Sequence, residues 1–372
     1  MAFASPPPSV LEVRDPGWET VVVSFAHRGA AGFAYYRLLD ELPVSRVFVR
    51  DPTDSWYNGD VAGLGATVAE ITRTLRDAIG ETGATRVVTL GSSMGGYAAA
   101  LFGCLLSAER VVALSPQTLL DRRFPLAPAA DVRLQVPDLR PVIDAAIGTD
   151  VLAVTGGDDL VDAFYVGRLA GLPTVRSLAV PDASHTFADE LHRRGRLVPV
   201  LADLVDGAVP DDCRAHPCAD PDVAARVDEA VLRFHDRDPA GAASAIEPVC
   251  AALPRWAGAQ FLRGRALLAT ARPAEAAEAF GAARDANPGW FEPYRELGRA
   301  LLALGRVDEA ETYLRRAVEL RPHWAEAHVF LADCVARQGN VAEARDLLDR
   351  ALELKPVLGP EVAPRLAALG PD

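Results

Sequence analysis

The chain has no long uninterrupted run of apolar residues, so no membrane span is expected. Its first residues, Met1 to Pro8, lack the basic start and apolar core of a secretion signal. Cysteine is scarce and irregularly spaced, with five residues in all: Cys104, Cys213, Cys218, Cys250 and Cys334. An odd number without framework spacing argues against a disulfide scaffold. We therefore expect a cytoplasmic protein whose thiols are reduced.

Basic residues are few relative to acidic ones. The chain has 38 Lys and Arg residues against 51 Asp and Glu residues, which gives a net charge of −13. Because neutralisation of phosphates dominates the affinity of proteins for nucleic acids, we expect no nucleic-acid partner. Cys213, His216 and Cys218 cluster, but a structural zinc site needs a fourth ligand. We therefore expect no metal and no cofactor.

The 372 residues, 50% of them hydrophobic, are enough for two or three domains. After an N-terminal tail over 1–17, apolar runs typical of strands alternate with helical patterns. Strands are predicted at 19–25, 44–50, 86–90, 111–114, 151–155 and 174–180, and helices at 33–42, 61–79, 94–106, about 160–170 and 187–206. This alternation predicts an α/β domain over 18–206 with a mostly parallel, doubly wound sheet.

A serine between glycines follows the predicted strand 86–90 directly, in the run Gly91-Ser92-Ser93-Met94-Gly95-Gly96. A serine at a tight turn from strand to helix exposes its hydroxyl, and small neighbours avoid clashes there. No lysine follows the glycines, as a phosphate-binding P-loop requires. The run therefore predicts Ser93 as a nucleophile.

The other strand ends offer a base and an acid. Ligands of parallel sheets bind at the carboxyl ends of the strands, where His185 follows the last predicted strand and three aspartates follow the strand before it. An imidazole can take the proton of a serine hydroxyl, and an acid must orient that imidazole. We predict His185 as the base and Asp159 as the acid, with Asp162 and Asp158 as alternatives.

The Gly91, Ser93, Gly95 pattern and the order serine, aspartate, histidine resemble the α/β-hydrolase family over roughly 18–206. The resemblance implies a compact domain with little cap, because only 115–148 is available for one. It implies acyl-enzyme chemistry on an ester, a thioester or a similar acyl bond. It also supports Asp159, which stands three residues after Gly156, a spacing common in the family.

The same resemblance implies an oxyanion hole built from backbone N–H groups. Met94, the residue after the nucleophile, supplies one donor, and the second follows the first strand at Ala26 or His27. Asp51, Trp56 and Tyr57 follow the second predicted strand and are candidates to line the mouth of the site, although the aromatic pair is equally compatible with a packing lid.

Residues 207–221 are rich in Pro, Asp and Ala without a period and predict a linker. Beyond them, three kinds of residue recur every 34 positions: Pro254, Pro288, Pro322 and Pro356; Ala242, Ala276, Ala310 and Ala344; Trp256, Trp290 and Trp324. This period resembles the tetratricopeptide family, and the best unit carries Leu297, Gly298, Gly305, Ala310, Leu314, Ala317 and Pro322. We predict an all-α solenoid over 222–372, with about four units and a capping helix at 360–369.

In the tetratricopeptide family the first helix of each unit lines a groove, which implies groove positions for Arg265, Arg295 and Arg299. Arginines there suit an acidic peptide or a C-terminal carboxylate, although solvated faces are an equally good interpretation. Three functions remain open. The chain is a serine hydrolase with an acyl substrate, an acyltransferase with the same chemistry, or an adaptor with an inactive hydrolase scaffold. In each case the repeats serve a protein partner or self-association, and no membrane is involved.

Overall fold

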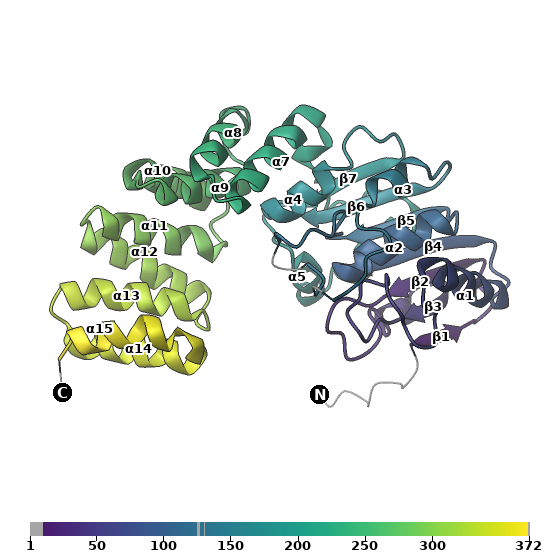
Figure 1. The fold of residues 1–372 in the computed structure, drawn as a ribbon, viewed down its shortest axis with the longest axis horizontal. Helices are drawn as coiled ribbons and strands as arrows, with labels where there is room; N and C mark the ends of the chain where they lie inside the picture. The colour runs from purple at the N-terminus through teal and green to yellow at the C-terminus, as the bar shows by residue number, and fades with distance from the viewer. Residues whose placement is uncertain (1–9, 125–126, 130, 371–372) are drawn as a thin grey trace. The chain divides into compact units, whose positions relative to one another are not determined.

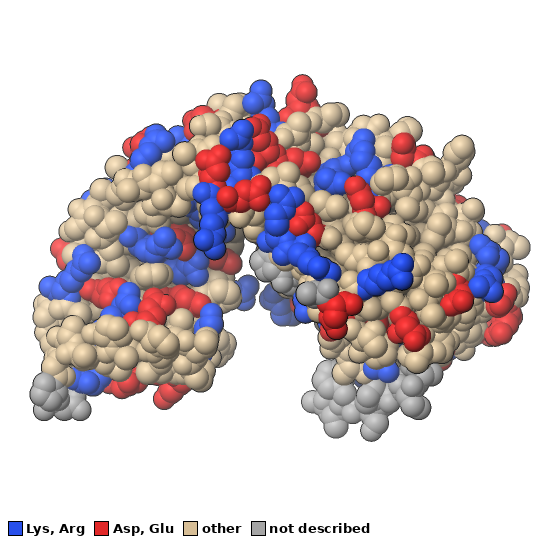
Figure 2. Space-filling view, viewed as in Figure 1, with Lys and Arg blue, Asp and Glu red and all other residues tan. Residues whose placement is uncertain are grey.

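The computed structural model describes residues 10–124, 127–129 and 131–370. They form two compact units, Met1–Asp228 and Glu229–Asp372 (Figure 1). In the described residues, no helix has both the length and the apolar character needed to cross a membrane. On the face drawn in Figure 2, acidic and basic side chains are interspersed rather than gathered into a surface of one sign.

The first unit is built around a mixed eight-stranded sheet with the order β1-β3-β2-β4-β5-β6-β7-β8. The strands are β1 (Leu11–Arg14), β2 (Thr20–Phe25), β3 (Ser45–Val49), β4 (Arg86–Ser92), β5 (Arg110–Leu114), β6 (Asp150–Gly156), β7 (Val175–Val180) and β8 (Arg214–Ala215). The pairings from β3 through β7 are parallel, and the edge strands β1 and β8 are antiparallel. The inner strands match the six predicted ones.

Both faces of the sheet are covered, as the alternation along β2 makes plain. Val21 and Val23 belong to one apolar core and Val22 belongs to the other. The first core includes residues of α1 (Val68–Glu81), α2 (Met94–Leu105), α3 (Arg140–Asp144) and α4 (Leu160–Gly167), and the second includes residues of the 3₁₀ turn η1 (Leu38–Glu41), α5 (Phe187–Arg193) and α6 (Leu197–Asp206). Among the described residues between β5 and β6, α3 is the only α-helix. This segment is therefore too short to form a large cap over the sheet.

Several predicted boundaries are wrong. The predicted tail includes β1, while residues 1–9 lie outside the described part of the chain. The predicted linker, 207–221, contributes β8 and the 3₁₀ turn η2 (Pro217–Ala219) to the first unit. The helix predicted at 61–79 begins at Val68 because Thr67 caps it. The helix predicted at 187–206 is two helices, since Gly195 has a left-handed backbone between them.

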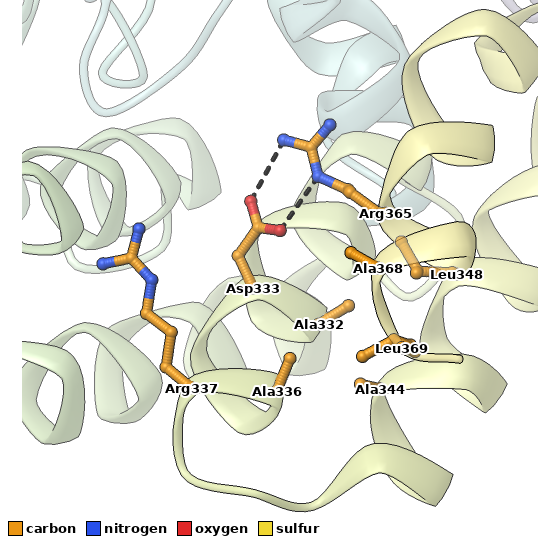
Figure 3. Close-up of a pocket in the computed structure, with 9 residues that line it drawn as sticks. All are labelled: Ala332, Asp333, Ala336, Arg337, Ala344, Leu348, Arg365, Ala368 and Leu369. Atoms are coloured by element: carbon orange, nitrogen blue, oxygen red, sulfur yellow. Dashed lines mark hydrogen bonds and ion pairs between the residues drawn. The ribbon is translucent and has the colours of Figure 1, made fainter.

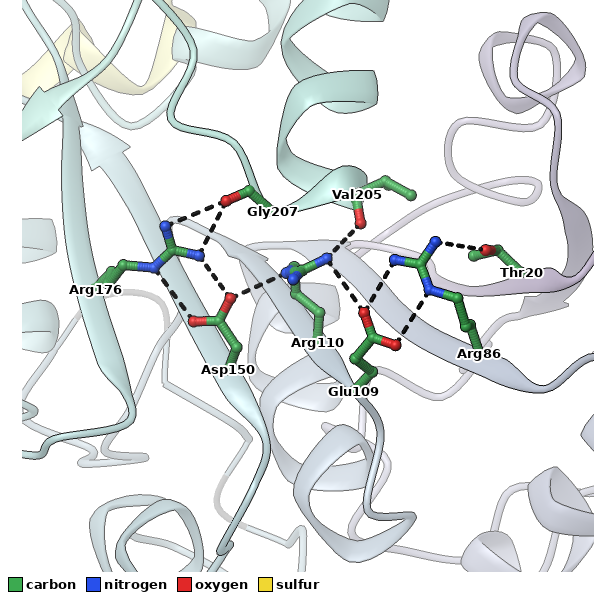
Figure 4. A network of polar contacts seen from close by, with 8 residues as sticks. All are labelled: Thr20, Arg86, Glu109, Arg110, Asp150, Arg176, Val205 and Gly207. Carbon is green, nitrogen blue, oxygen red and sulfur yellow. Dashed lines mark hydrogen bonds and ion pairs between the residues drawn. The ribbon is translucent and has the colours of Figure 1, made fainter.

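A polar network holds the amino ends of the inner strands (Figure 4). The Asp150 carboxylate accepts hydrogen bonds from Arg110 Nε at 3.0 Å and from Arg176 Nη2 at 2.6 Å. The same two arginines donate to the carbonyls of Val205 and Gly207 at the end of α6. Burial raises the pKa of Asp150, but the hydrogen bonds and charges of the two arginines lower it by more. The net shift of this pKa is therefore downward. This network ties α6 to the sheet at the edge opposite the glycine-flanked serine.

The second unit is a row of helices, and its division from the first falls inside α7 (Pro221–His235). The others are α8 (Pro239–Ala252), α9 (Ala257–Ala269), α10 (Pro273–Ala286), α11 (Phe291–Ala303), α12 (Val307–Leu320), α13 (Ala325–Arg337), α14 (Val341–Leu354), the 3₁₀ turn η3 (Pro356–Leu358) and α15 (Gly359–Ala368). A Cβ on Gly298 would lie 2.4 Å from Leu314 Cγ. The repeated glycine therefore lets the two helices of a unit pack closely.

Candidate functional site

Ser93 lies at the sharp turn between β4 and α2. Its φ of 56° and ψ of −117° are strained for a residue with a side chain, and such strain persists where the surroundings over-determine it. The Ser93 N–H donates to Leu114 O at 2.8 Å, which fixes the turn to the end of β5. The serine therefore stands at the carboxyl edge of the sheet, where the sequence predicts it.

The flanking glycines leave no room for side chains. A Cβ on Gly91 would lie 2.1 Å from Gly95 O, and one on Gly95 would lie 2.4 Å from Phe25 O. A Cβ on Gly96 would lie 2.7 Å from Leu114 O. Backbone atoms occupy all three directions, so the turn requires glycine at these positions.

His185 follows β7, and its imidazole Nδ1 lies 2.8 Å from Asp162 Oδ1. The Asp162 side chain is 2% exposed and that of His185 is 27% exposed, so a buried acid holds a base that reaches the surface. The prediction that Asp159 is the acid that orients His185 is wrong. Asp159 caps α4 instead and accepts hydrogen bonds from the N–H groups of Val161 and Asp162. The alternative, Asp162, makes the contact from the first turn of the helix.

The two carboxylates beside His185 control its charge. Burial of His185 lowers its pKa, but the charge and hydrogen bond of Asp162, with the charge of Asp159, raise it overall to about 9. Burial and the charge of Asp162 raise the pKa of Asp159 to about 6. Near neutral pH the imidazole is therefore mostly protonated.

The serine turn and the His185–Asp162 pair meet at the end of β5. Leu114 accepts the hydrogen bond from the Ser93 N–H, and the next residue, Ser115, donates its hydroxyl to Asp162 Oδ2 at 2.7 Å. In the described part of the chain no hydrogen bond joins the Ser93 hydroxyl to His185.

The predicted backbone donors are the N–H groups of Met94 and of either Ala26 or His27. Met94 is the first residue of α2, where N–H groups have no partner within the helix. Gly95 lies against the carbonyls of Phe25 and Ala26, so the end of β2 adjoins this helix start. The proposal of Ala26 as a donor is wrong, because its N–H already donates to a β3 carbonyl, that of Val49, at 2.9 Å.

The side chains predicted to line the mouth are buried instead. Asp51, Trp56 and Tyr57 are 3%, 1% and 0% exposed. Trp56 Nε1 donates to Gln117 Oε1 at 2.7 Å, and the Tyr57 hydroxyl donates to Ala26 O at 3.1 Å. Asp51 accepts from the Tyr57 N–H and organises their loop. The mouth-lining interpretation is therefore wrong, and the packing alternative describes these residues.

No group of three or more His, Cys, Asp and Glu side chains within residues 10–124, 127–129 and 131–370 is arranged to hold a metal ion. In the predicted cluster, Cys213 and Cys218 are buried thiols and His216 Nδ1 accepts a hydrogen bond from the Cys218 N–H at 3.0 Å. The histidine thus caps η2.

Sequence reasoning missed Ser115. It directly follows the predicted strand 111–114, so the rule that selected Ser93 and His185, a polar side chain at the carboxyl end of a strand, applies to it as well.

Two of the three arginines predicted in the groove of the second unit pair with the same carboxylate. Arg295 Nη2 and Arg299 Nη1 lie 2.6 Å and 2.9 Å from the two oxygens of Glu296, whose side chain is 5% exposed. The Arg265 guanidinium lies over the Phe234 ring at 4.7 Å. Burial, Arg295 and Arg299 all lower the pKa of Arg265, and only the charge of Glu296 opposes this. Arg265, Arg295 and Arg299 therefore interact electrostatically with one another and with Glu296.

A separate hollow of about 340 Å³ lies between α13, α14 and α15 (Figure 3). It is lined by Ala332, Asp333, Ala336, Arg337, Ala344, Leu348, Arg365, Ala368 and Leu369. Arg365 Nε and Nη2 donate to the two Asp333 oxygens at 2.9 Å and 3.0 Å, which fastens α15 to α13. This ion pair fits the predicted role of the last helix as a cap.

Two tetratricopeptide-repeat family models match the second unit, one over residues 266–323 and one over residues 295–357. Residues 266–357 are tetratricopeptide repeats. Similar solved structures include the crystal structure of MamA, 22% identical over 34% of this chain and 74% of that chain, with a TM-score of 0.33. Another is the first TPR of Spaghetti (RPAP3) bound to the HSP90 peptide SRMEEVD, 21% identical over 30% of this chain and 89% of that chain, with a TM-score of 0.30. No curated protein sequence matches the chain.

Proposed function

We propose that the first unit is a serine hydrolase of the α/β-hydrolase fold that cleaves an ester, a thioester or a similar acyl bond. The observation that carries the proposal is the contact of the buried Asp162 with His185. Asp162 also accepts a hydrogen bond from Ser115, which directly follows Leu114, the residue whose carbonyl fixes the strained turn of Ser93. The serine after β4, the acid after β6 and the histidine after β7 support it further. The tetratricopeptide repeats support protein–protein interaction, and their part in this function is to bind a protein partner.

The proposed reaction uses these residues in fixed roles. The Ser93 oxygen attacks the acyl carbon while His185 Nε2 takes its proton, and Asp162 stabilises the resulting imidazolium. The negative oxygen of the tetrahedral intermediate accepts hydrogen bonds from the N–H groups of Met94 and His27. His185 then gives its proton to the leaving group as the bond to it breaks. Water repeats the sequence on the acyl-serine and releases the acid.

Turnover of nitrophenyl esters and acyl thioesters tests this proposal. The wild-type protein should hydrolyse these substrates and release the free acid. Ser93→Ala should reduce the rate of hydrolysis to the uncatalysed background. Preferential transfer of the acyl group to an added alcohol or amine would indicate an acyltransferase. An inert wild-type protein that still binds a partner through its repeats would contradict the hydrolase and leave an adaptor.

The rate of the proposed hydrolase should rise with pH. His185 must be neutral to act as a base, and its pKa of about 9 keeps it protonated below that value. We expect kcat/KM to fall about tenfold for each pH unit below that pKa, because only the neutral fraction reacts. Ester hydrolysis from pH 6 to 10, corrected with Ser93→Ala, measures this profile. A plateau from pH 6 upward would contradict it.

The three arginines Arg265, Arg295 and Arg299 suit an acidic peptide with a free C-terminal carboxylate. Arg299→Ala is expected to weaken the binding of a fluorescent acidic peptide roughly tenfold, since a charge-assisted hydrogen bond is lost. Arg316→Ala is the matched control, because Arg316 is also about half exposed and pairs with a glutamate three residues away. Fluorescence anisotropy measures both affinities. Equal losses in the two variants, or equal binding of the C-terminally amidated peptide, would contradict the groove assignment.

A further inference from the structure

Ser115 occupies an unusual place at the end of β5. It is fully buried, and its φ of 43° lies in the left-handed region that residues with side chains rarely adopt. Its N–H donates to Val154 O at 2.7 Å, so the neighbouring strand β6 holds its backbone. Strain of this kind persists where surrounding contacts fix a residue and is common at functional sites.

The Ser115 hydroxyl contacts both members of the acid–base pair. It donates to Asp162 Oδ2 at 2.7 Å and lies 3.2 Å from the backbone carbonyl of His185. The other oxygen of Asp162, Oδ1, pairs with His185 Nδ1 at 2.8 Å. Each oxygen of this buried carboxylate therefore has one partner, and the two partners fix the plane of the carboxylate.

Without the Ser115 hydroxyl, Asp162 Oδ2 would lose this donor while its side chain stays 2% exposed. A buried charged oxygen that lacks a donor is costly, so the carboxylate would rotate or shift to find another. Asp159, one helical turn earlier, is already used to cap α4 through hydrogen bonds from the N–H groups of Val161 and Asp162. Rotation of Asp162 would misalign Oδ1 with the imidazole.

We propose that Ser115 is a positioning residue of the hydrolase site, whose hydroxyl aligns Asp162 with His185 so that the imidazole faces Ser93. This role rests on the proposed function, since it acts on the reaction through the acid and the base. Ser115 does not touch the substrate. It therefore governs the rate of the chemical steps and leaves the binding of the substrate unchanged.

Ser115→Gly is the sharpest test, because glycine adopts the left-handed backbone and removes only the hydroxymethyl group. Its kcat for ester hydrolysis should fall roughly 10- to 100-fold, as expected for a lost hydrogen bond to a charged group, while KM stays unchanged. Ser115→Ala should lose as much. Thr118→Val is the matched control, because Thr118 is equally buried and donates only to the Tyr165 carbonyl. It should keep wild-type kcat.

A double-mutant cycle separates positioning from a general effect on the fold. In a His185→Ala background the Ser115→Gly change should cause no further loss of Ser93 labelling by a fluorophosphonate, since the hydroxyl acts through His185. A further loss of similar size there would overturn the positioning role. Wild-type kcat in Ser115→Gly, with thermal unfolding unchanged, would overturn it as well. If the wild-type protein itself does not hydrolyse esters, the proposed function fails. That outcome is distinct from the two results that would overturn the positioning role of Ser115.

Discussion

Asp162→Asn is expected to lower kcat/KM for ester hydrolysis by about 10⁴-fold with little change in the fold. Asparagine keeps the size of the buried side chain, but an amide cannot hold the imidazole in the tautomer that accepts a proton from serine, nor can it stabilise the imidazolium. The Nδ1 of His185 would lose the charged partner that lies 2.8 Å away. Steady-state kinetics on a nitrophenyl ester, with circular dichroism as a check on folding, measures the effect.

Asp159→Asn is the matched control for that variant. Asp159 accepts two backbone N–H groups at the start of α4, and asparagine is as good an N-cap as aspartate. We expect activity to stay within about tenfold of wild type, because the helix start is retained. Loss of the Asp159 charge should also lower the pKa of His185, so the rise in rate should occur at lower pH. A greater loss of activity in Asp159→Asn than in Asp162→Asn would contradict the assignment of Asp162 as the acid.

Gly91→Ala is expected to destabilise the protein by about 3 kcal/mol or more, because the new methyl group would collide with backbone that cannot move cheaply. Its Cβ would lie 2.1 Å from Gly95 O, and α2 would have to move away from β4. Any folded fraction should be inactive, since α2 supplies the Met94 N–H. Urea unfolding followed by circular dichroism measures the loss.

Gly80→Ala provides the comparison for Gly91→Ala. Gly80 lies inside α1, and a Cβ added to it would meet no atom within 4 Å, so alanine should stabilise the helix by up to about 1 kcal/mol. Wild-type stability in Gly91→Ala would contradict the close packing of the serine turn.

Buried features could be predicted from the sequence. Strands such as β2 and β6 lie between two layers of helices, so they appear as runs of mostly apolar residues rich in valine. The edge strands could not be predicted, because β8 has two exposed residues and β1 is only partly buried. The 34-residue period predicted the repeats, since each unit places alanine and glycine where helices pack closely.

The details of the site depend on single side chains that no pattern distinguishes. Asp159 and Asp162 stand one helical turn apart, and Asp162 rather than Asp159 pairs with His185, because Asp159 is used to cap the helix. Ala26 and His27 are adjacent in the sequence, and only the hydrogen bond from the Ala26 N–H to β3 excludes Ala26 as a donor. The sequence around Trp56 is typical of an exposed loop, but its ring nitrogen pairs with Gln117, which is distant in the sequence.

Labelling of the wild-type protein with a fluorophosphonate tests the central claim most directly, because the probe reacts only with a serine that a neighbouring base activates. We expect one adduct per chain, mapped by peptide mass spectrometry to Ser93. We also expect the adduct to be absent in Ser93→Ala and strongly reduced in His185→Ala. No labelling of the folded wild-type protein, or undiminished labelling of Ser93→Ala, would contradict the assignment of Ser93 as an activated nucleophile.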